Sequence, residues 1–353
     1  MKILIIQQKM IGDVLTSSIL FEALRLEYPK AELHYLIYSH TVPVIANNPN
    51  IDKVIQFNDN TKKALEFHSF LKKIRKKNYD VVIDVYAKLG SAITSKYSEA
   101  KIRISFDKWY THLFYTHFFS RNIEAKTNAG PAIEKRLRLL KPIMKNVPSE
   151  IKPKIFLAED EKIIAKKILS EAGISNNKPL LMIAVLGSSA FKTYPSKYLA
   201  EILDLIVENS EAQLLFNYIP SQIEEAKAVF NYCNPKTKNA IFFDVFGKNL
   251  REFLALTSYC DALIGNEGGA INMAKALNVP TFAIFSPSVP KENWNMYENG
   301  ITNVSVHIKD YHPELFNKYS AKELKQKSKE LYNLFQPSYF EDKLLNFINP
   351  INK

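Results

Sequence analysis

The chain has 353 residues, of which 46% are hydrophobic and 24% are charged, and this composition excludes a disordered or fibrous protein. Its length predicts two domains of ordinary size. The net charge of +11 favours anionic partners such as nucleic acid, phospholipid head groups or a phosphorylated substrate, although solvated helix faces account for part of it. The sequence contains no apolar run of the roughly 18 residues that cross a bilayer and no recognisable signal peptide, so we expect a cytoplasmic protein.

Cysteine and histidine are too sparse for a disulfide framework or a metal centre. The two cysteines, Cys233 and Cys260, are expected to be small buried residues. The seven histidines form no recognised metal-binding pattern, and the sequence carries no nucleic-acid-binding motif. We therefore expect no metal, no other cofactor and no nucleic-acid partner.

β-rich runs alternate with amphipathic helical stretches from the N-terminus onwards, which predicts parallel sheets covered by helices on both faces. In the first half the expected strands are residues 2–7, 33–38, 53–57, 80–85 and 101–105. The expected helices of this half are residues 13–27, 61–77 and 131–145. Residues 142–153, with Pro148 and Pro153, indicate an extended crossing between two domains.

A second alternating series begins near residue 180. Its expected strands are residues 180–186, 212–218, 240–245, 261–265 and 280–285. Its expected helices are residues 196–208, 221–232, 249–258 and 270–277, followed by terminal helices at 320–334 and 338–349. We therefore predict domains at residues 1–150 and 151–335. Residues 336–353 hold a terminal helix that is a candidate to pack back on the N-terminal domain.

The predicted fold class is α/β, with two Rossmann-like domains that each contain a doubly wound parallel sheet. Open sheets of this kind bind ligands outside the carboxyl ends of their strands. We therefore expect the two domains to face a central cleft and to bind ligands there.

Glycine is scarce, with 10 residues in the chain, and its positions are therefore informative. Three glycines lie in the turn 265–269, between an expected strand and an expected helix, while Gly12 and Gly187 each follow the first strand of a domain. Such turns let a ligand approach the backbone, and the following helix N-terminus attracts phosphate. The turn matches neither the dinucleotide fingerprint nor the Walker A loop, which disfavours a generic NAD or ATP enzyme. The alternative is that these glycines only relax tight turns.

Three separated segments carry a more specific pattern. The first is Ile3-Leu4-Ile5-Ile6 followed by Ile11-Gly12-Asp13-Val14-Leu15, and the second is Leu186-Gly187-Ser188-Ser189 with Lys192 and Tyr194-Pro195. The third runs from Ile264-Gly265-Asn266-Glu267-Gly268-Gly269 through the next expected helix to Pro280-Thr281. In this order and spacing, the three segments resemble the lipopolysaccharide heptosyltransferase family, glycosyltransferase family 9, and together they cover most of the chain.

The resemblance implies a GT-B fold, with the acceptor on the N-terminal domain and the sugar nucleotide on the C-terminal domain. Members of the family transfer heptose from an ADP-activated donor to the lipopolysaccharide core, with inversion and without an essential metal. The expected partners are thus a nucleotide-sugar donor and an anionic glycolipid acceptor, with a peripheral contact to the cytoplasmic membrane face as a further expectation. The alternatives are a GT-B transferase or epimerase that uses a UDP-sugar, or a non-catalytic nucleotide-sugar-binding protein.

On the acceptor side, the resemblance makes Asp13 the catalytic base that takes the proton from the acceptor hydroxyl. Its alternative role is that of a helix N-cap. Gly12, Arg103, Arg136 and Arg138 are the other candidate acceptor-binding residues. The segment 102–121 interleaves basic and aromatic side chains, which fits either core packing or an acceptor-side or membrane-surface patch.

On the donor side, the candidate residues are Gly187, Ser188, Ser189, Lys192, Gln222, Glu267, Gly268, Gly269, Ala270 and Asn272. Lys192, the serine hydroxyls and the amides of Gly268–Ala270 would stabilise the departing diphosphate, unless Lys192 is merely solvated and the serines form a polar turn. Gln222 corresponds roughly to a family glutamate that holds the donor ribose. Glu267 and Asn272 stand where the family commonly has aspartate and histidine, so the donor sugar and base can differ from ADP-heptose.

Overall fold

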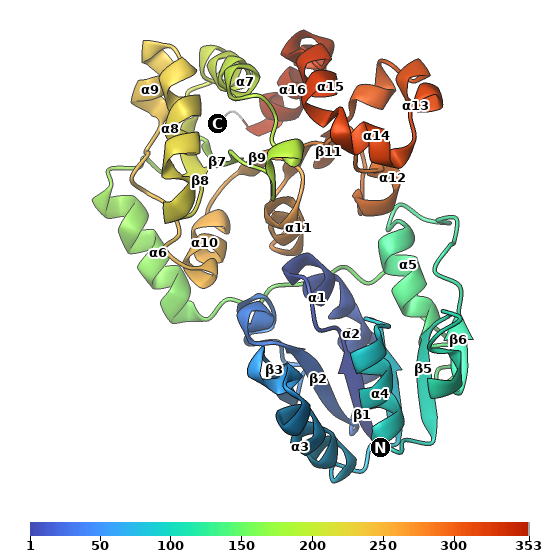
Figure 1. Ribbon diagram of the computed structural model, residues 1–353. Helices are drawn as coiled ribbons and strands as arrows, with labels where there is room; N and C mark the ends of the chain where they lie inside the picture. The colour runs from blue at the N-terminus through green and yellow to red at the C-terminus, as the bar shows by residue number, and fades with distance from the viewer. Residues whose placement is uncertain (352–353) are drawn as a thin grey trace. The chain divides into compact units, whose positions relative to one another are not determined.

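Two parallel β-sheets organise the chain, and each is covered by helices on both faces (Figure 1). The computed structural model describes residues 1–351 and divides the chain into two units, Met1–Phe156 and the part from Leu157 onwards. The division falls close to residue 150, where the sequence suggests a domain boundary, and it follows a stretch without regular secondary structure.

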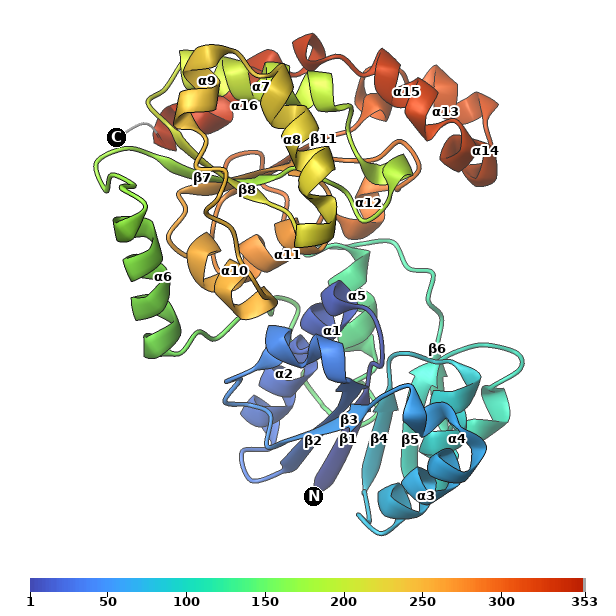
Figure 2. The same cartoon turned by 60° about the vertical axis from the view of Figure 1, so that its left-hand side comes forward.

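The first unit is a six-stranded parallel sheet in the order β3-β2-β1-β4-β5-β6. Its strands are β1 (Lys2–Ile6), β2 (Glu32–Tyr38), β3 (Lys53–Phe57), β4 (Val81–Asp84), β5 (Ile102–Phe106) and β6 (His117–Phe119). Its helices are α1 (Ile11–Ser17), α2 (Ile19–Glu27), α3 (Ala64–Arg75), α4 (Leu89–Tyr97) and α5 (Pro131–Arg138). Helices α1, α2 and α5 cover one face of the sheet, and α3 and α4 cover the other (Figures 1 and 2).

The second unit repeats this plan with the strand order β11-β10-β9-β7-β8. Its strands are β7 (Leu180–Ala184), β8 (Gln213–Asn217), β9 (Ala262–Asn266), β10 (Thr281–Ile284) and β11 (Asn303–Val306). Its helices are α6 (Glu159–Glu171), α7 (Ser196–Glu208), α8 (Ile223–Tyr232), α9 (Pro235–Ala240), α10 (Leu250–Thr257), α11 (Gly269–Ala276), α12 (Lys291–Trp294), α13 (Glu314–Lys318), α14 (Ala321–Gln326), α15 (Ser328–Leu334) and α16 (Glu341–Ile348). Helices α7, α8, α9 and α16 cover one face, and α6, α10 and α11 cover the other (Figure 2).

Strand composition explains why these sheets are parallel and buried. β1 is apolar from Ile3 to Ile6 and its four side chains are fully buried, as expected for a strand covered on both faces. In each sheet the strand order reverses beside the first strand of the unit, between β1 and β4 and between β7 and β9. Ligands of doubly wound sheets bind outside the carboxyl ends of the strands at this point.

The expected strand 240–245 is wrong, because only Ile241 pairs with β8, through a single parallel bridge to Leu214. The Phe242 amide donates to the Leu214 carbonyl, but the Val245 amide turns back to the Phe242 carbonyl and ends the pairing. The expected helix 13–27 is interrupted at Ser18, whose hydroxyl donates to the Leu15 carbonyl and separates α1 from α2.

The terminal helix expected in residues 336–353 is α16, and residues 352 and 353 lie outside the described part of the chain. Its buried side chains Leu344 and Phe347 belong to the core of the second unit, where the Phe347 ring lies 5.6 Å from the Phe282 ring of β10. This helix therefore packs on the core of the second unit, and a contact with the N-terminal domain stays a prediction. Within residues 1–351 no helix is long and apolar enough to cross a bilayer.

Candidate active site

The three sequence motifs lie at the carboxyl ends of the strands beside each reversal of strand order. In the first unit, Gly12 and Asp13 follow β1 and lie in the first turn of α1. In the second unit, the loop 187–192 follows β7 and the turn 267–270 follows β9, and these two strands are direct neighbours. The fold therefore brings together the second and third motifs.

Asp13 forms an ion pair with Arg136, whose Nη2 lies 2.6 Å from Asp13 Oδ1. The Arg136 side chain is 4% exposed and the Asp13 side chain is 27% exposed. Arg136 also donates through Nε to the Ser17 hydroxyl (2.9 Å) and through Nη1 to the Ala132 carbonyl (2.6 Å). Burial lowers the pKa of the Arg136 guanidinium, and the Asp13 carboxylate opposes that shift. The buried guanidinium thus fixes one carboxylate oxygen and leaves part of the carboxylate accessible.

Asp13 is not an N-cap, because α1 begins after Met10, which occupies the cap position. Direct acceptor binding by Arg136 does not fit its burial and its three protein partners. We therefore expect Arg136 to hold Asp13 in position. Arg103 likewise donates to the Phe114 carbonyl (2.9 Å) and the Ala100 carbonyl (2.6 Å), which makes it an anchor of the β5–β6 connection.

Arg138 lies on a different face of α5 from Arg136. Its guanidinium carbon is 5.9 Å from the centre of the Phe119 ring, and it lines a cavity of about 670 Å³ together with Lys126 and Lys141. Arg138 therefore remains a candidate for contact with an anionic acceptor. Nothing in the sequence singles out Lys135, the neighbour of Arg136, yet burial and the nearby Arg136 lower its pKa to about 8.

Lys192 and Glu267 form the corresponding pair of the second unit. Lys192 Nζ lies 3.1 Å from Glu267 Oε1, close enough for an ion pair although this oxygen lacks a well-directed hydrogen bond. The Lys192 side chain is 26% exposed, whereas the Glu267 side chain is 7% exposed. A partly accessible ammonium thus lies beside the turn that begins α11, where backbone amides point outward from the helix N-terminus.

The loop that carries Lys192 folds back on itself, and Gly187 makes this possible. A Cβ at Gly187 would lie 2.1 Å from the Lys192 carbonyl oxygen, so no other residue fits without moving the loop. The Gly187 amide donates to the Thr193 hydroxyl (3.1 Å), which donates to the Ser189 carbonyl (3.0 Å). Gly187 is therefore required for the shape of this loop.

In the glycine turn, Gly265 and Gly268 are required for different reasons. Gly265 (φ +131°) lies against β7, where a Cβ would be 2.5 Å from the Ala184 carbonyl oxygen. Gly268 (φ +146°) precedes α11 with open space around it. Glycine is required there because of its positive φ, which other residues rarely adopt. Asn266 joins the two loops, since its side chain accepts from the Tyr194 amide (2.7 Å) and donates to the Ala184 carbonyl (3.0 Å).

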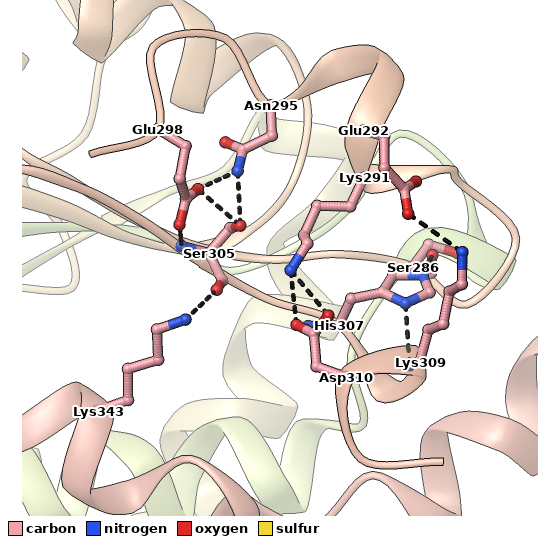
Figure 3. A network of polar contacts seen from close by, with 10 residues as sticks. All are labelled: Ser286, Lys291, Glu292, Asn295, Glu298, Ser305, His307, Lys309, Asp310 and Lys343. Atoms are coloured by element: carbon pink, nitrogen blue, oxygen red, sulfur yellow. Dashed lines mark hydrogen bonds and ion pairs between the residues drawn. The ribbon is translucent and has the colours of Figure 1, made fainter. Parts of the chain in front are cut away.

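A network of polar contacts follows β10 and β11, where the His307 ring reaches the Ser286 backbone (Figure 3). The Ser286 hydroxyl, after β10, donates to the Phe191 carbonyl (3.0 Å). His307, after β11, accepts the Lys309 amide at Nδ1 (3.0 Å), so its Nε2 carries the hydrogen that points at the Ser286 carbonyl (3.1 Å). Burial lowers the pKa of His307 to about 4, which keeps the ring neutral.

The remaining donor-side candidates are more dispersed. The Ser189 hydroxyl is buried and has no hydrogen-bond partner within residues 1–351, while Ser188 is exposed. Gln222 lies beyond β8, where its side-chain oxygen accepts the Ile219 amide (3.3 Å). Asn272 is partly buried at the end of the first turn of α11. The part of the chain described here holds no group of three or more His, Cys, Asp or Glu side chains suited to a metal ion, and the absence of a metal requirement stays a prediction.

The family model for glycosyltransferase family 9 (heptosyltransferase) matches residues 67–324, well over half of the chain and all of the donor-side loops. The chain belongs to this family. A lipopolysaccharide heptosyltransferase 1 from Campylobacter coli is 27% identical over 301 residues, which cover 83% of this chain and 86% of that relative. Family 9 members are glycosyltransferases, and this chain is therefore an enzyme of that class.

Solved structures of family 9 proteins share the fold. A family 9 glycosyltransferase from Veillonella parvula superimposes with a TM-score of 0.73 at 18% identity, covering 94% of this chain and 97% of that one. The Escherichia coli heptosyltransferase WaaC with ADP gives a TM-score of 0.68 at 15% identity, covering 97% of this chain and 100% of that one. The same protein with ADP-2-deoxy-2-fluoro heptose gives 0.64 at 16% identity, covering 95% and 98%. The family 9 chain described here thus has the GT-B fold.

Proposed function

We propose that this family 9 enzyme transfers heptose from ADP-heptose to a lipopolysaccharide core or a related surface glycan, with inversion and without a metal ion. The observation that carries the proposal is the Lys192–Glu267 pair beside the N-terminus of α11, an accessible cation next to outward-pointing amides. The heptosyltransferase relative and the ADP-bound and ADP-sugar-bound structures of WaaC support a heptose donor activated by ADP.

In this mechanism Asp13 acts as the base. Its carboxylate takes the proton of the acceptor hydroxyl while the hydroxyl oxygen forms a bond to the anomeric carbon of the donor. The bond from that carbon to the diphosphate oxygen breaks on the opposite face, and its electron pair leaves with ADP. Arg136 holds Asp13 Oδ1, so the second carboxylate oxygen is the one that meets the acceptor. Arg136 is a positioning residue in this scheme.

Charge accumulates on the leaving diphosphate as the bond breaks. Lys192, which is paired with Glu267 at the start of this turn, and the amides of Gly268–Ala270 would stabilise that charge. The Ser189 hydroxyl lacks a hydrogen-bond partner within the described residues and would gain one from a phosphate oxygen after a small movement of its loop. In the absence of donor, Glu267 holds the ammonium in place.

Two residues bear on the identity of the donor. Glu267 is long enough to reach Lys192 across the β7–β9 edge, which ties this carboxylate to the phosphate-binding cation. Asn272 offers an amide where the family commonly has histidine, so it cannot add positive charge next to the phosphates. A UDP-sugar donor is therefore the alternative that the experiment must separate from ADP-heptose.

The test compares donors directly. The chain is incubated with ADP-heptose or UDP-sugars and a heptose-deficient core acceptor, with and without a chelator, while nucleoside diphosphate release and acceptor mass are measured. We expect ADP release, a mass increase of one heptose, and no effect of the chelator. Thermal-shift titrations with ADP and UDP provide an independent measure of nucleotide preference. Turnover or stabilisation by the uridine nucleotide alone would overturn the ADP-heptose proposal.

A further inference from the structure

An exposed apolar cluster lies in the connection between the edge strands β5 and β6. Trp109 is 90% exposed and Leu113 is 88% exposed, and Tyr110 and Phe118 are 42% and 40% exposed. We call these four residues the apolar wedge. Isolated exposed apolar residues are common, but four large ones within ten residues are a concentration of exposed apolar surface, and such surface marks interaction sites.

The wedge is not the tip of a loose loop, because the connection that carries it is anchored at several points. The Tyr115 hydroxyl donates to the Asp84 carboxylate (2.6 Å), and burial raises the pKa of that carboxyl group. Arg103 Nε donates to the Phe114 carbonyl (2.9 Å), and Lys108 Nζ donates to the Ala87 carbonyl (2.5 Å). The exposure of Trp109 and Leu113 is therefore built into the folded connection.

Core packing and surface exposure are divided among different residues of the same segment. Phe106 and Tyr115 are buried at 3% and 7% exposure, so they supply the packing that an aromatic-rich segment can provide. Trp109 and Leu113 contribute almost nothing to that packing. Each keeps its side chain in water at a cost in free energy that a partner surface would remove.

The charges around the wedge are predominantly positive. Lys108 and Arg121 both bind the loop after β4, where Arg121 Nη2 donates to the Tyr86 carbonyl (3.2 Å) and where the exposed Lys88 follows. Asp107 is the acidic residue beside the wedge, and it lies 3.2 Å from His112. Tryptophan and tyrosine rings flanked by lysine and arginine match the interface of an anionic bilayer, where rings sit at head-group level and cations meet phosphates.

We propose that the apolar wedge, with Lys88, Lys108 and Arg121, docks this enzyme on a bilayer that contains anionic phospholipid. Trp109 and Leu113 enter the boundary between head groups and acyl chains, and the three cations contact lipid phosphates. Trp109 follows β5 and therefore lies on the same carboxyl edge of the first sheet as Asp13. This orientation would present the base to an acceptor held in the membrane. The inference goes beyond the proposed function, because it concerns a lipid surface whichever sugar is transferred.

The first experiment uses tryptophan fluorescence with the wedge unaltered. The chain has two tryptophans, so the Trp294→Phe variant leaves Trp109 as the reporter. We expect a blue shift of its emission with vesicles of equal parts phosphatidylcholine and phosphatidylglycerol, and a much smaller shift with phosphatidylcholine alone. Emission that stays at the wavelength of a fully hydrated tryptophan in both mixtures would overturn the proposal.

The second experiment measures co-sedimentation of the full chain with the same vesicles, in the absence of donor and acceptor. The Trp109→Ser/Leu113→Ser double variant should bind at least about tenfold more weakly. Leu65→Ser is the matched control, because Leu65 is 84% exposed on α3 of the same unit, and it should bind like the unaltered chain. Equal binding by the double variant and the control would contradict the proposal.

Two further readouts separate this inference from its competitors. If sedimentation velocity shows that the chain self-associates through the wedge and does not bind vesicles, the wedge is a contact between copies and the proposal fails. Transfer to a water-soluble acceptor fragment should be unchanged in the double variant. Vesicle binding without any transfer would overturn the proposed function and leave the membrane inference intact.

Discussion

The two units hold two ion pairs that are opposite in design. In the first unit the buried partner is the cation: Arg136 is 4% exposed and Asp13 is 27% exposed. In the second unit the buried partner is the anion: Glu267 is 7% exposed and Lys192 is 26% exposed. In each pair the accessible residue follows a strand beside the point where the sheet reverses its order, Asp13 after β1 and Lys192 after β7. The accessible member is thus a carboxylate in the first unit and an ammonium in the second.

From this difference we expect the two pairs to serve two kinds of chemistry. Separating a buried charge from its partner raises the free energy strongly, because an unpaired ion in the interior carries a large desolvation penalty. The buried member therefore fixes the accessible one, and we expect the accessible one to meet the substrate. A carboxylate suits removal of a proton, and an ammonium suits a diphosphate. We therefore expect Asp13 to act on the acceptor and Lys192 to act on the diphosphate.

The largest effect is expected for Asp13→Asn. The amide keeps the size of the side chain and cannot take a proton, so turnover should fall by about 10²–10⁴-fold. Donor affinity, measured by titration calorimetry with ADP, should stay unchanged, because the donor is assigned to the other unit. Unchanged product formation with the true donor and acceptor would remove Asp13 from the role of base.

Lys192→Met tests the other accessible member. Removal of the ammonium should lower kcat/KM for the donor by about 10²-fold, since one electrostatic donor to the leaving group is lost. Lys192→Arg restores the charge and should recover part of the activity. The acceptor KM, measured at saturating donor, is the control and should not change. An increase in acceptor KM alone would move Lys192 out of the phosphate site.

Arg136→Met removes a buried positioning cation. We expect kcat to fall by about 10-fold or more while the acceptor KM changes little, because Arg136 orients Asp13 and does not bind the acceptor. Arg138→Met is the matched control, and it should alter the acceptor KM and leave kcat in place. The reverse pattern would restore Arg136 to acceptor binding.

Gly187→Ala separates loop shape from side-chain chemistry. The added Cβ would meet the Lys192 carbonyl at 2.1 Å, so the loop must shift and donor affinity should drop by several-fold. Gly90→Ala is the control, because a Cβ at Gly90 in α4 meets nothing within 4 Å. Equal ADP affinity in the two variants, measured by thermal shift, would show that the Lys192 loop tolerates rearrangement.

The smallest effect concerns His307 and pH. Its pKa falls from 6.5 to about 4 on burial, so the unfolded chain binds a proton that the folded chain does not between these values. Stability should therefore decrease as pH falls from 6.5 towards 4, by at most about 3 kcal/mol from this group. His307→Asn removes the titrating ring, and its melting temperature should depend less on pH over that range. Parallel pH dependences for the two proteins would exclude this contribution.

Much of the fold follows from runs of apolar residues. The strand 53–57 and the helix 196–208 have the expected bounds. A short apolar run marks the strand, and a strong helical period of apolar residues marks the helix. Short edge elements were missed: β6 has three residues and β11 has four. The helix α4 was missed because Leu89–Tyr97 contains glycine, two serines and a threonine, which are weak helix formers.

The site was predictable where its residues are close in sequence to a glycine turn, and less so where they meet across the chain. Gly187, Lys192 and Glu267 lie together as the motifs suggested. Arg136 contacts Asp13 across 123 residues and is buried, although arginine is usually exposed, so no local pattern could reveal the pair. Asp84, which anchors the β5–β6 connection through Tyr115, could have been singled out from the sequence, since it is the polar residue that ends the apolar strand β4.

The support of the Lys192 loop by the end of the chain has a consequence for synthesis on the ribosome. Tyr332 donates its hydroxyl to the Lys192 carbonyl across 140 residues (3.4 Å), and the Tyr194 hydroxyl donates to the Phe335 carbonyl. The nascent second unit therefore lacks these supports until α15 and Phe335 have left the exit tunnel. The first unit is already complete by then, so it matures well before the Lys192 loop.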